Sequence, residues 1–336
     1  MKRILTLLFT ATTITISACQ EKMKKYEWIP TECAPKNYPV QIYKGIFYYG
    51  TDKKVNVPDG RVVNYGWGEN GSINLVGEKL KEAPTRLEIA WISFAEKKNY
   101  AGKFELDTKK IDSLLEQGYA DDTEDNGKGI YNYIKVGMAP GGELVIWLTG
   151  VRNKQIEVGH FKANPVESLN WKQVYPNLEG SFDTYIENVL KELPEESRKE
   201  ITSGKIPFGY WESLRKRYTW KVVVKSPADI SRLDLYYVNK ERDFTFGAAL
   251  KSVDFKASAI VEELSVYWLD QLNRELRTEI KFDELETKAA FEKIKEGESA
   301  ELIVNIDPQK KDTDVILKTP STTVTLKNIK FQSFYQ

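Results

Sequence analysis

The second half of the chain repeats the order of apolar segments found in the first half. Each half runs through two strands, a helix, a strand, a turn and further strands. The matched segments are Leu87–Ile92 with Leu264–Leu269, Phe104–Asp107 with Ile280–Asp283, Ile134–Pro140 with Leu302–Pro308, and Val145–Leu148 with Val315–Lys318. A chain with this pattern is restricted to folds in which two related modules are built from the same elements.

The first module is predicted to consist mainly of strands, because β-branched and aromatic residues recur between turn signals. The predicted strands are Val40–Tyr49, Arg86–Ala95, Tyr100–Leu106, Ile130–Met138, Leu144–Thr149 and Gln155–Lys162. The turns between neighbouring strands are short, which favours antiparallel pairing. A helix interrupts the strands, with Asp107 as its N-cap and Gly118 at its end. In the second module, Asp283 and Glu286 have the spacing of a capping box, and Gly297 is predicted to end that helix.

The segment between the modules has a helical pattern instead. Apolar residues fall on one broad helical face from Phe182 to Leu193. Pro194 suits the first position of a further helix, which Gly204 is predicted to end. The expected fold class is therefore α+β, mostly antiparallel β, with two related β-rich modules, each with one helix, joined by a helical connector. The predicted boundaries are 28–163 for the first module, 164–217 for the connector and 218–336 for the second module.

The amino terminus reads as an export signal. Lys2 and Arg3 precede an uncharged run from Ile4 to Ile16, which is too short to span a bilayer of about 30 Å. Ile16–Cys19 is similar to the lipobox of bacterial lipoproteins, in which the cysteine is acylated, with palmitate for example, and becomes the first mature residue. We therefore predict a signal peptide over 1–18, lipidation at Cys19 and a tether over 19–27. A plain secretory peptide with an incidental Cys19 is the alternative.

Lipidation would decide both the cysteine chemistry and the location. If Cys19 carries lipid, Cys33 has no cysteine partner within the chain, whereas in an uncleaved chain the two could pair. Gln20 is not the aspartate associated with inner-membrane retention in enteric bacteria, and Gln20–Lys22 is not the acidic run of surface-exported lipoproteins. By analogy, we expect the periplasmic face of the outer membrane. Lys22, Lys24 and Lys25 could touch anionic headgroups.

Charge and composition exclude some partners. Lys and Arg together number 49, as do Asp and Glu, so the formal net charge is zero. Binding to a nucleic-acid backbone needs a cationic surplus, so a nucleic-acid partner is not expected. The chain has 18 Tyr, 14 Phe and 8 Trp, a share of rings that suits β-rich cores and sites that bind by stacking.

No catalytic or metal site is predicted. His160 is the only histidine, and it lies in an alternating strand pattern that favours a partly buried strand residue over a nucleophile's base. Asp121, Asp122, Glu124 and Asp125 lack the glycine and glutamate positions of an EF-hand, so a solvated loop is expected. Carboxylates are abundant, but none has a spacing that singles out a glycosidase pair. No cofactor is expected.

The loop Gly66–Gly71 is the candidate binding loop. It has the glycine density of a phosphate-binding loop but lacks the Gly-Lys-Ser/Thr ending that holds phosphate and magnesium. A tight loop that presents Trp67, with Glu69 beside it, is the preferred interpretation. A rigid ring on such a loop would give contact area at little entropic cost. Met138–Gly142 is interpreted as a hairpin turn.

Several strings of residues together carry a family resemblance. They are Tyr38–Val40, Val57–Gly60, Gly66–Glu69, Trp91, Tyr100–Leu106, Val136–Gly142, Ile206–Trp211 and Arg217–Tyr218. In combination they resemble the bacterial lipoprotein family catalogued as domain of unknown function 2931. The resemblance implies an envelope lipoprotein of Gram-negative bacteria, and the family has no assigned reaction to carry over. Some relatives lie near genes for interbacterial secretion systems, which implies that an immunity role is conceivable.

The sequence thus favours a non-catalytic, lipid-anchored envelope protein that binds a protein partner. Two alternatives stay open. An immunity lipoprotein would neutralise one secreted interbacterial effector. A glycan-binding protein or hydrolase of the envelope would show a groove lined by rings and carboxylates.

Overall fold

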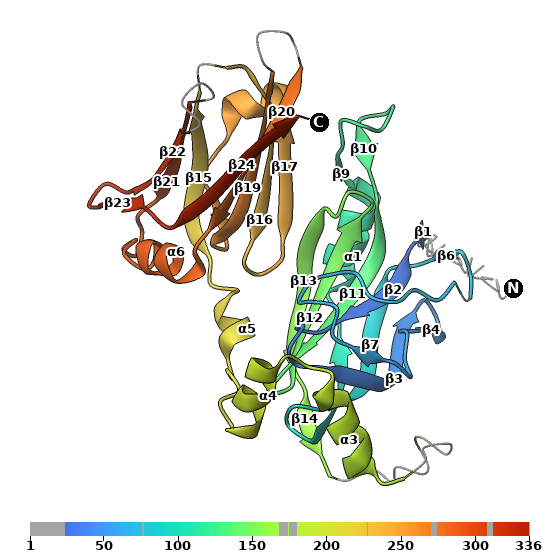
Figure 1. The fold of residues 1–336 in the computed structure, drawn as a ribbon. Helices are drawn as coiled ribbons and strands as arrows, with labels where there is room; N and C mark the ends of the chain where they lie inside the picture. Colours follow the sequence, from blue (N-terminus) through green and yellow to red (C-terminus); the bar gives the residue numbers. More distant parts are fainter. Residues whose placement is uncertain are drawn as a thin grey trace, which may run out of the picture.

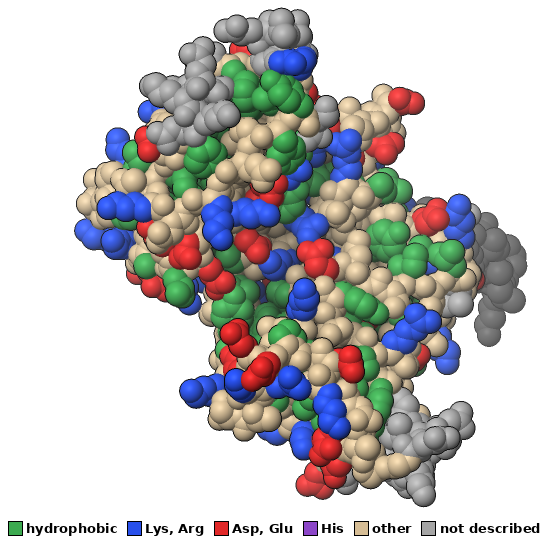
Figure 2. All heavy atoms as spheres, in the orientation of Figure 1, with side chains coloured by type: hydrophobic (Ala, Val, Ile, Leu, Met, Phe, Trp, Pro, Cys, Tyr) green, Lys and Arg blue, Asp and Glu red, His purple; other side chains and the backbone are tan. Residues whose placement is uncertain are grey.

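A computed structural model describes residues 24–75, 77–167, 174, 180–226, 228–269, 274–307 and 312–335. Cys19, Lys22 and the predicted signal peptide therefore lie outside the described residues. On the visible face of the molecule, basic and acidic side chains are interspersed rather than separated into patches of one sign (Figure 2). This distribution agrees with the balanced charge of the sequence.

The first module contains two main groups of paired strands. One is a sheet of order β14-β8-β7-β3-β4, with β5 also pairing with β3, and the other runs β2-β11-β12-β13. The bounds are β2 (Ile29–Cys33), β3 (Val40–Tyr49), β4 (Lys53–Asn56), β5 (Val62–Val63), β7 (Pro84–Ser93), β8 (Lys98–Glu105), β11 (Tyr131–Ala139), β12 (Glu143–Gly150), β13 (Gln155–Lys162) and β14 (Asn164–Val166). Short pairs are β1 (Tyr26–Glu27) with β6 (Leu80–Lys81) and β9 (Tyr119–Ala120) with β10 (Lys128–Gly129). All these pairs are antiparallel except β2 with β11.

The second module repeats this arrangement. Its strands run β24-β20-β19-β16-β17 in one group and β18-β15-β21-β22-β23 in the other, where β15 pairs in parallel with β21 as β2 does with β11. The bounds are β15 (Tyr218–Lys225), β16 (Ile230–Tyr237), β17 (Arg242–Phe246), β18 (Lys256–Ser258), β19 (Val261–Leu269), β20 (Glu275–Phe282), β21 (Ala300–Asp307), β22 (Asp312–Lys318), β23 (Thr323–Leu326) and β24 (Ile329–Tyr335). The predicted fold class, mostly antiparallel β in two related modules, is confirmed.

One helix occupies the same place in each module. α1 (Thr108–Gln117) follows β8, and α6 (Glu284–Phe291) follows β20. The Asp107 carboxylate caps α1 by accepting from the Lys110 N–H at 3.0 Å, and Asp283 caps α6 in the same way through Glu286. α6 ends at Phe291, earlier than the predicted Gly297. The reciprocal half of the capping box is also absent, because the Glu286 carboxylate accepts from the backbone N–H groups of Lys327 and Asn328.

The two modules are joined by strand pairing as well as by the chain. β13 of the first module pairs with β17 of the second through Gln155 and Arg242. Among the described strands, this pairing joins the β2-β11-β12-β13 group of the first module to the β17-β16-β19-β20-β24 group of the second. The result is one nine-stranded sheet of order β2-β11-β12-β13-β17-β16-β19-β20-β24 (Figure 1). The 3-10 helix η1 (Gly247–Ser252) follows β17. The sequence did not predict this continuous sheet.

In the part of the connector that the structure describes, three short helices have defined bounds. They are α3 (Phe182–Lys191), α4 (Glu195–Thr202) and α5 (Tyr210–Ser213). Ser181 caps α3, and Ile186 of that helix packs with Ile92 and Phe94 of the first module. Pro194 is the N-cap of α4 rather than its first residue. β14, at the start of the predicted connector, pairs with β8 and so extends the first module's sheet.

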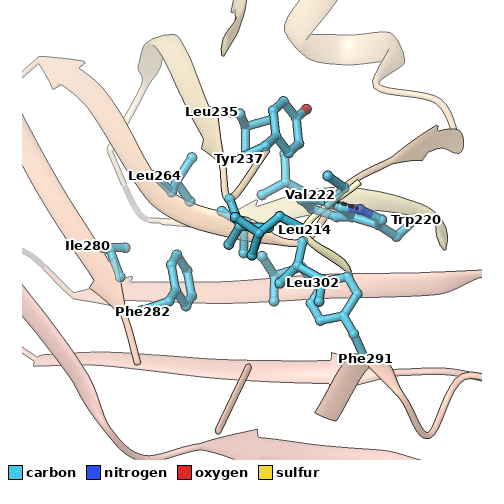
Figure 3. Close-up of a cluster of buried hydrophobic side chains, with 14 of the residues drawn as sticks. Leu214, Trp220, Val222, Leu235, Tyr237, Leu264, Ile280, Phe282, Phe291 and Leu302 are labelled. Carbon is cyan, nitrogen blue, oxygen red and sulfur yellow. Dashed lines mark hydrogen bonds between the residues drawn. The ribbon is translucent and has the colours of Figure 1, made fainter. Parts of the chain in front are cut away.

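Buried aromatic residues make up much of the core. In the second module, the Trp220 ring lies 5.4 Å from the ring of Phe291 on α6, and its N–H donates to the Ala259 carbonyl at 3.1 Å (Figure 3). The same hydrophobic cluster continues into the first module through Trp67 and Trp147. The modules therefore share core residues, and their relative placement is set by packing.

Candidate functional site

The loop Gly66–Glu69 is held rigidly against the first module. The Gly66 N–H donates to the Ala34 carbonyl at 3.0 Å, and the Gly68 N–H donates to Cys33 Sγ at 3.3 Å. The Gly68 carbonyl accepts from the buried Lys135 ammonium at 2.5 Å. Gly68 has φ +73°, a left-handed conformation that glycine adopts without strain. The loop is therefore fixed at both of its glycines.

Trp67 does not project from this loop into solvent, as the sequence interpretation supposed. Its residue is only 8 % exposed, and its ring meets the rings of Trp147 at 5.1 Å and Trp211 at 6.4 Å. Space for the ring comes from Gly137, where a Cβ would lie 2.9 Å from the Trp67 ring and 2.5 Å from that of Trp147. Trp67 thus belongs to a cluster of buried rings, with Trp147 and Trp211, that joins the first module to α5.

Glu69, the second candidate residue, lies at the border between the modules. Its carboxylate accepts from the Arg242 guanidinium of β17 at 2.8 Å. The structure therefore gives the two candidate residues different positions: Trp67 is buried among other rings, and Glu69 lies at the surface in an ion pair with the second module.

Both residues line a cleft where the loop, α5 and the second module meet. Its volume is about 420 Å³, within the range of small-ligand pockets. Its lining consists of Pro35, Lys36, Gly66, Trp67, Glu69, Tyr210, Trp211, Leu214, Val238, Lys240, Val261, Glu262, Phe282 and Glu284. Most of these residues come from parts of the chain that the sequence interpretation did not connect with Trp67.

The carboxylates on the rim of the cleft have partners within the protein. Lys240 Nζ lies 2.6 Å from the Glu262 carboxylate, and the Tyr210 hydroxyl donates to Glu284 at 2.7 Å. Burial, and then the hydrogen bond to Glu284, raise the pKa of Tyr210 well above its usual range. Together with the Glu69–Arg242 pair, each carboxylate of the lining has a partner within the protein. A ligand without charge can therefore enter without breaking an ion pair.

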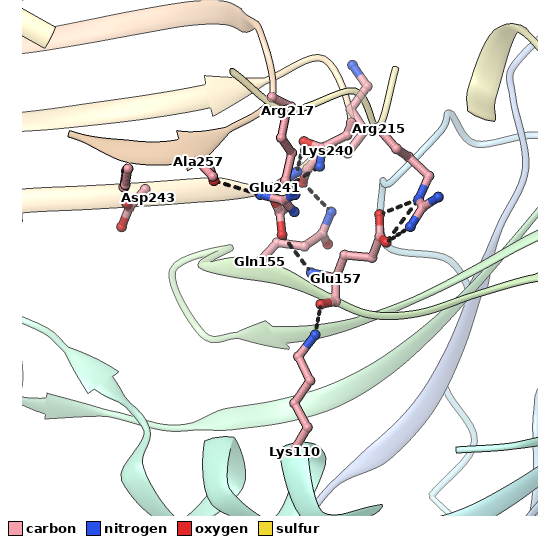
Figure 4. Close-up of polar contacts among 12 residues, drawn as sticks. Lys110, Gln155, Glu157, Arg215, Arg217, Lys240, Glu241, Asp243 and Ala257 are labelled. Carbon is pink, nitrogen blue, oxygen red and sulfur yellow. Dashed lines mark hydrogen bonds and ion pairs between the residues drawn. The ribbon is translucent and has the colours of Figure 1, made fainter. Parts of the chain in front are cut away.

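A network of polar contacts beside the cleft holds the modules in this arrangement (Figure 4). Arg215, which follows α5, donates to the Glu157 carboxylate of β13 at 2.6 to 3.0 Å. Arg217 donates to Glu241 at 2.7 Å, and the Glu241 carboxylate accepts from the Glu157 backbone N–H at 3.1 Å. Charge-assisted and bidentate bonds of this kind add geometric specificity. These contacts link the first module, the connector and the second module beside the cleft.

Comparison with known families decides the family of the chain. Residues 15–209 match the model of a family described as protein of unknown function, DUF2931. The chain belongs to the DUF2931 family. No curated protein and no solved structure matches the chain.

Only part of the cleft lining belongs to the residues that match DUF2931. It includes Gly66–Glu69 and ends at Gly209, so α5 and the second-module wall lie beyond it. The resemblance proposed from the sequence is confirmed, although its strings from Tyr210 to Tyr218 fall outside the matched residues. In the part of this DUF2931 member that the structure describes, no helix is long and apolar enough to cross a membrane.

The remaining sequence candidates lie apart from the cleft. His160 on β13 is partly buried, and its Nε2 lies 2.9 Å from the Glu143 carboxylate. In the predicted solvated loop, Asp121 is buried and accepts from Thr123, and Asp122 accepts from Arg232 of the second module at 3.0 Å. Among the described residues of this DUF2931 chain, no group of His, Cys, Asp and Glu side chains could hold a metal ion.

Lys135 supports the candidate loop at an electrostatic cost. It is almost fully buried, and its ammonium donates to two neutral acceptors, the Gly68 carbonyl and Gln155 Oε1, each at 2.5 Å. Burial lowers the pKa of Lys135 from 10.5 to about 8. Below that pH the folded protein carries a charged amine that water would solvate better.

The Lys135 ammonium predicts a pH dependence of stability. Between about pH 8 and pH 10.5 the unfolded chain holds this proton and the folded protein does not, so the free energy of unfolding rises with pH. Relative to a Lys135→Met variant, the wild type should gain about 2 kcal/mol between pH 7 and pH 9.5. Urea unfolding of both proteins at the two pH values measures this gain. A difference that does not vary with pH would contradict the assignment.

Proposed function

We propose that this DUF2931 member is a lipid-anchored protein of the cell envelope that binds a protein partner through the cleft between its modules. The proposed anchor is lipid on Cys19, and the proposed location is the periplasmic face of the outer membrane. The family match begins at residue 15 and so includes Ile16–Cys19, the segment similar to a lipobox. This supports interpreting the segment as part of the family's pattern.

The composition of the cleft carries the proposal. Apolar side chains from three parts of the chain, Trp67 of the loop, Leu214 after α5 and Val261 of β19 among them, converge on one cavity. Burial of an apolar group there removes apolar surface from water, which is the main driving force of association. The rim carboxylates already have partners, so the cleft favours an uncharged apolar side chain on an extended segment of another protein.

A glycan is the second candidate ligand, because the cleft contains both rings and carboxylates. Sugar rings bind to proteins by stacking on open aromatic faces. Trp67 is 8 % exposed and Trp211 only 4 %, since the two rings pack against each other and against neighbouring rings. This burial leaves little open ring face on which a sugar could stack, which disfavours a glycan. An immunity role would be one case of the same proposal, with a secreted effector as the partner.

Blocking the mouth of the cleft tests the proposal. Lys36 lines the cleft and is exposed, so a Lys36→Trp variant should fill the entrance without disturbing the core. We expect the partner recovered from native membranes with this variant to fall by about tenfold or more, which corresponds to the loss of one apolar anchor. Quantitative mass spectrometry of the captured proteins measures the change.

Lys54→Trp is the matched control. Lys54 is an exposed residue of β4 and does not line the cleft, so the same bulky ring there should leave capture at the wild-type level. Equal capture by wild type and Lys36→Trp would contradict the cleft as the binding site. Binding of defined glycans that is lost only in Lys36→Trp would instead favour the glycan alternative.

A further inference from the structure

The first described residues place the tether beside one surface of the first module. The last two residues of the predicted tether, Tyr26 and Glu27, form strand β1, which pairs with β6 so that Glu27 lies opposite Leu80. In Figure 1 this pair lies at the edge of the first module that faces away from the second module. Any anchor at Cys19 therefore brings the β1–β6 edge of the protein towards the membrane.

Large apolar side chains are exposed at this edge. Leu75 is 80 % exposed, Leu80 is 51 % exposed and Ile73 is 47 % exposed. Hydrophobic side chains gather over β1 and β6 on the face shown in Figure 2. The segment that bears Ile73 and Leu75 is joined to the edge strand β2 at Ser72. The Thr31 hydroxyl donates to the Ser72 carbonyl at 2.9 Å, and the Ser72 N–H donates to the Glu32 carboxylate at 2.9 Å.

We propose that this apolar edge, defined as Ile73, Leu75 and Leu80, rests in the surface of the bilayer that holds the lipid on Cys19. The inference rests on the proposed lipid anchor and adds a fixed orientation to it. From Cys19 to Lys24 the chain can span at most about 17 Å. Because β1 begins two residues later, a bilayer at the anchor is within reach of side chains on its partner β6.

The charges around the apolar edge indicate that apolar contact, rather than headgroup charge, drives this docking. Lys79 pairs with Glu27 at 3.3 Å, Lys53 with Glu78 at 2.9 Å and Lys25 with Glu82 at 4.0 Å. Charges that are already paired add little binding free energy on an anionic membrane. Exposed leucines, in contrast, add binding free energy when they enter the acyl region of any membrane. Docking should therefore be the same on zwitterionic and anionic membranes, and it would point the second module away from the bilayer.

A fluorescent label in the apolar edge tests the proposal. Leu75→Cys, expressed as the full lipidated protein and labelled with an environment-sensitive dye, is placed in phosphatidylcholine vesicles. We expect emission at shorter wavelength and quenching by lipids brominated on their acyl chains. Leu285→Cys is the matched control, because Leu285 is 77 % exposed but lies on α6 of the second module. Its label should show neither effect. Cys33 is buried and should not react.

Each outcome separates the inference from the proposed anchor. A vesicle-bound protein whose Leu75 label is not quenched would overturn the docking of the apolar edge and leave the anchor standing. Quenching that needs anionic lipid, or that high salt abolishes, would overturn apolar contact as its cause. A protein that does not associate with vesicles at all would overturn the lipid anchor, and the orientation would fall with it.

Discussion

A Cys19→Ser variant is expected to leave the membrane fraction almost completely. Each methylene of a buried acyl chain contributes about 0.8 kcal/mol to membrane binding, so a cysteine with two or more chains is held nearly permanently. Serine at this position accepts no such lipid in the lipoprotein pathway that the lipobox implies. Fractionation of cells that express wild type or Cys19→Ser, with the mass of the mature amino terminus, measures the effect.

Cys33→Ser is the matched control for this experiment. Cys33 is buried and accepts the Gly68 N–H through its sulfur, a role that a serine oxygen can retain. This variant should therefore stay with the membrane. Cys19→Ser protein that has lost residues 1–18 and still sediments with membranes as the wild type does would contradict the anchor. Precursor processing that globomycin leaves unchanged would contradict it too.

A Gly68→Ala substitution is expected to destabilise the junction between the modules. A Cβ at Gly68 would lie 2.3 Å from Cβ of Lys240, which belongs to the second module and is not free to swing away. The left-handed backbone of Gly68, at φ +73°, costs any side chain about 1–2 kcal/mol. Overpacking against Lys240 adds roughly 1–3 kcal/mol. The loop that forms one wall of the cleft should therefore shift away from the second module.

Gly60→Ala isolates the effect of the module contact. Gly60 has the same φ of +73°, but a Cβ there would meet no atom within 4 Å. This control should lose only the backbone contribution of about 1–2 kcal/mol. Urea unfolding of the two variants measures the difference, and Gly68→Ala should also bind less partner. Equal destabilisation would show that the loop does not press against the second module.

Local pattern predicted the elements of the fold well. The ends of α1 follow from Asp107, which caps the helix, and from Gly118, which takes a positive φ after it. The bounds of β3 and β13 follow from alternation between turns. These features depend on residues close together in the chain. The repeated order of elements then predicted that the chain forms two related modules.

Contacts between distant residues could not be predicted in this way. The pairing of Gln155 with Arg242, which joins the modules into one sheet, leaves no periodic signal in either strand. The burial of Trp67 depends on the absence of a side chain at Gly137, on another strand. The sequence therefore predicted a tight loop at this position but misjudged the exposure of its ring.

The rest of the cleft shows the same limit. Lys240, Glu262 and Glu284 come from three different parts of the second module, and each is a common surface residue when considered alone. Tyr210 and Trp211 were already among the strings that carried the family resemblance. Their position opposite Trp67 becomes evident only when the connector is folded.

Photo-crosslinking from inside the cleft tests the central claim most directly. A photoreactive amino acid is introduced at Lys36 in the full lipidated protein, and at Lys54 as the control, and cells are irradiated before extraction. A partner that inserts into the cleft should give one adduct of defined mass from position 36 and none from position 54. Identical adducts from both positions, or none from position 36 in membrane-bound protein, would contradict a partner-binding cleft.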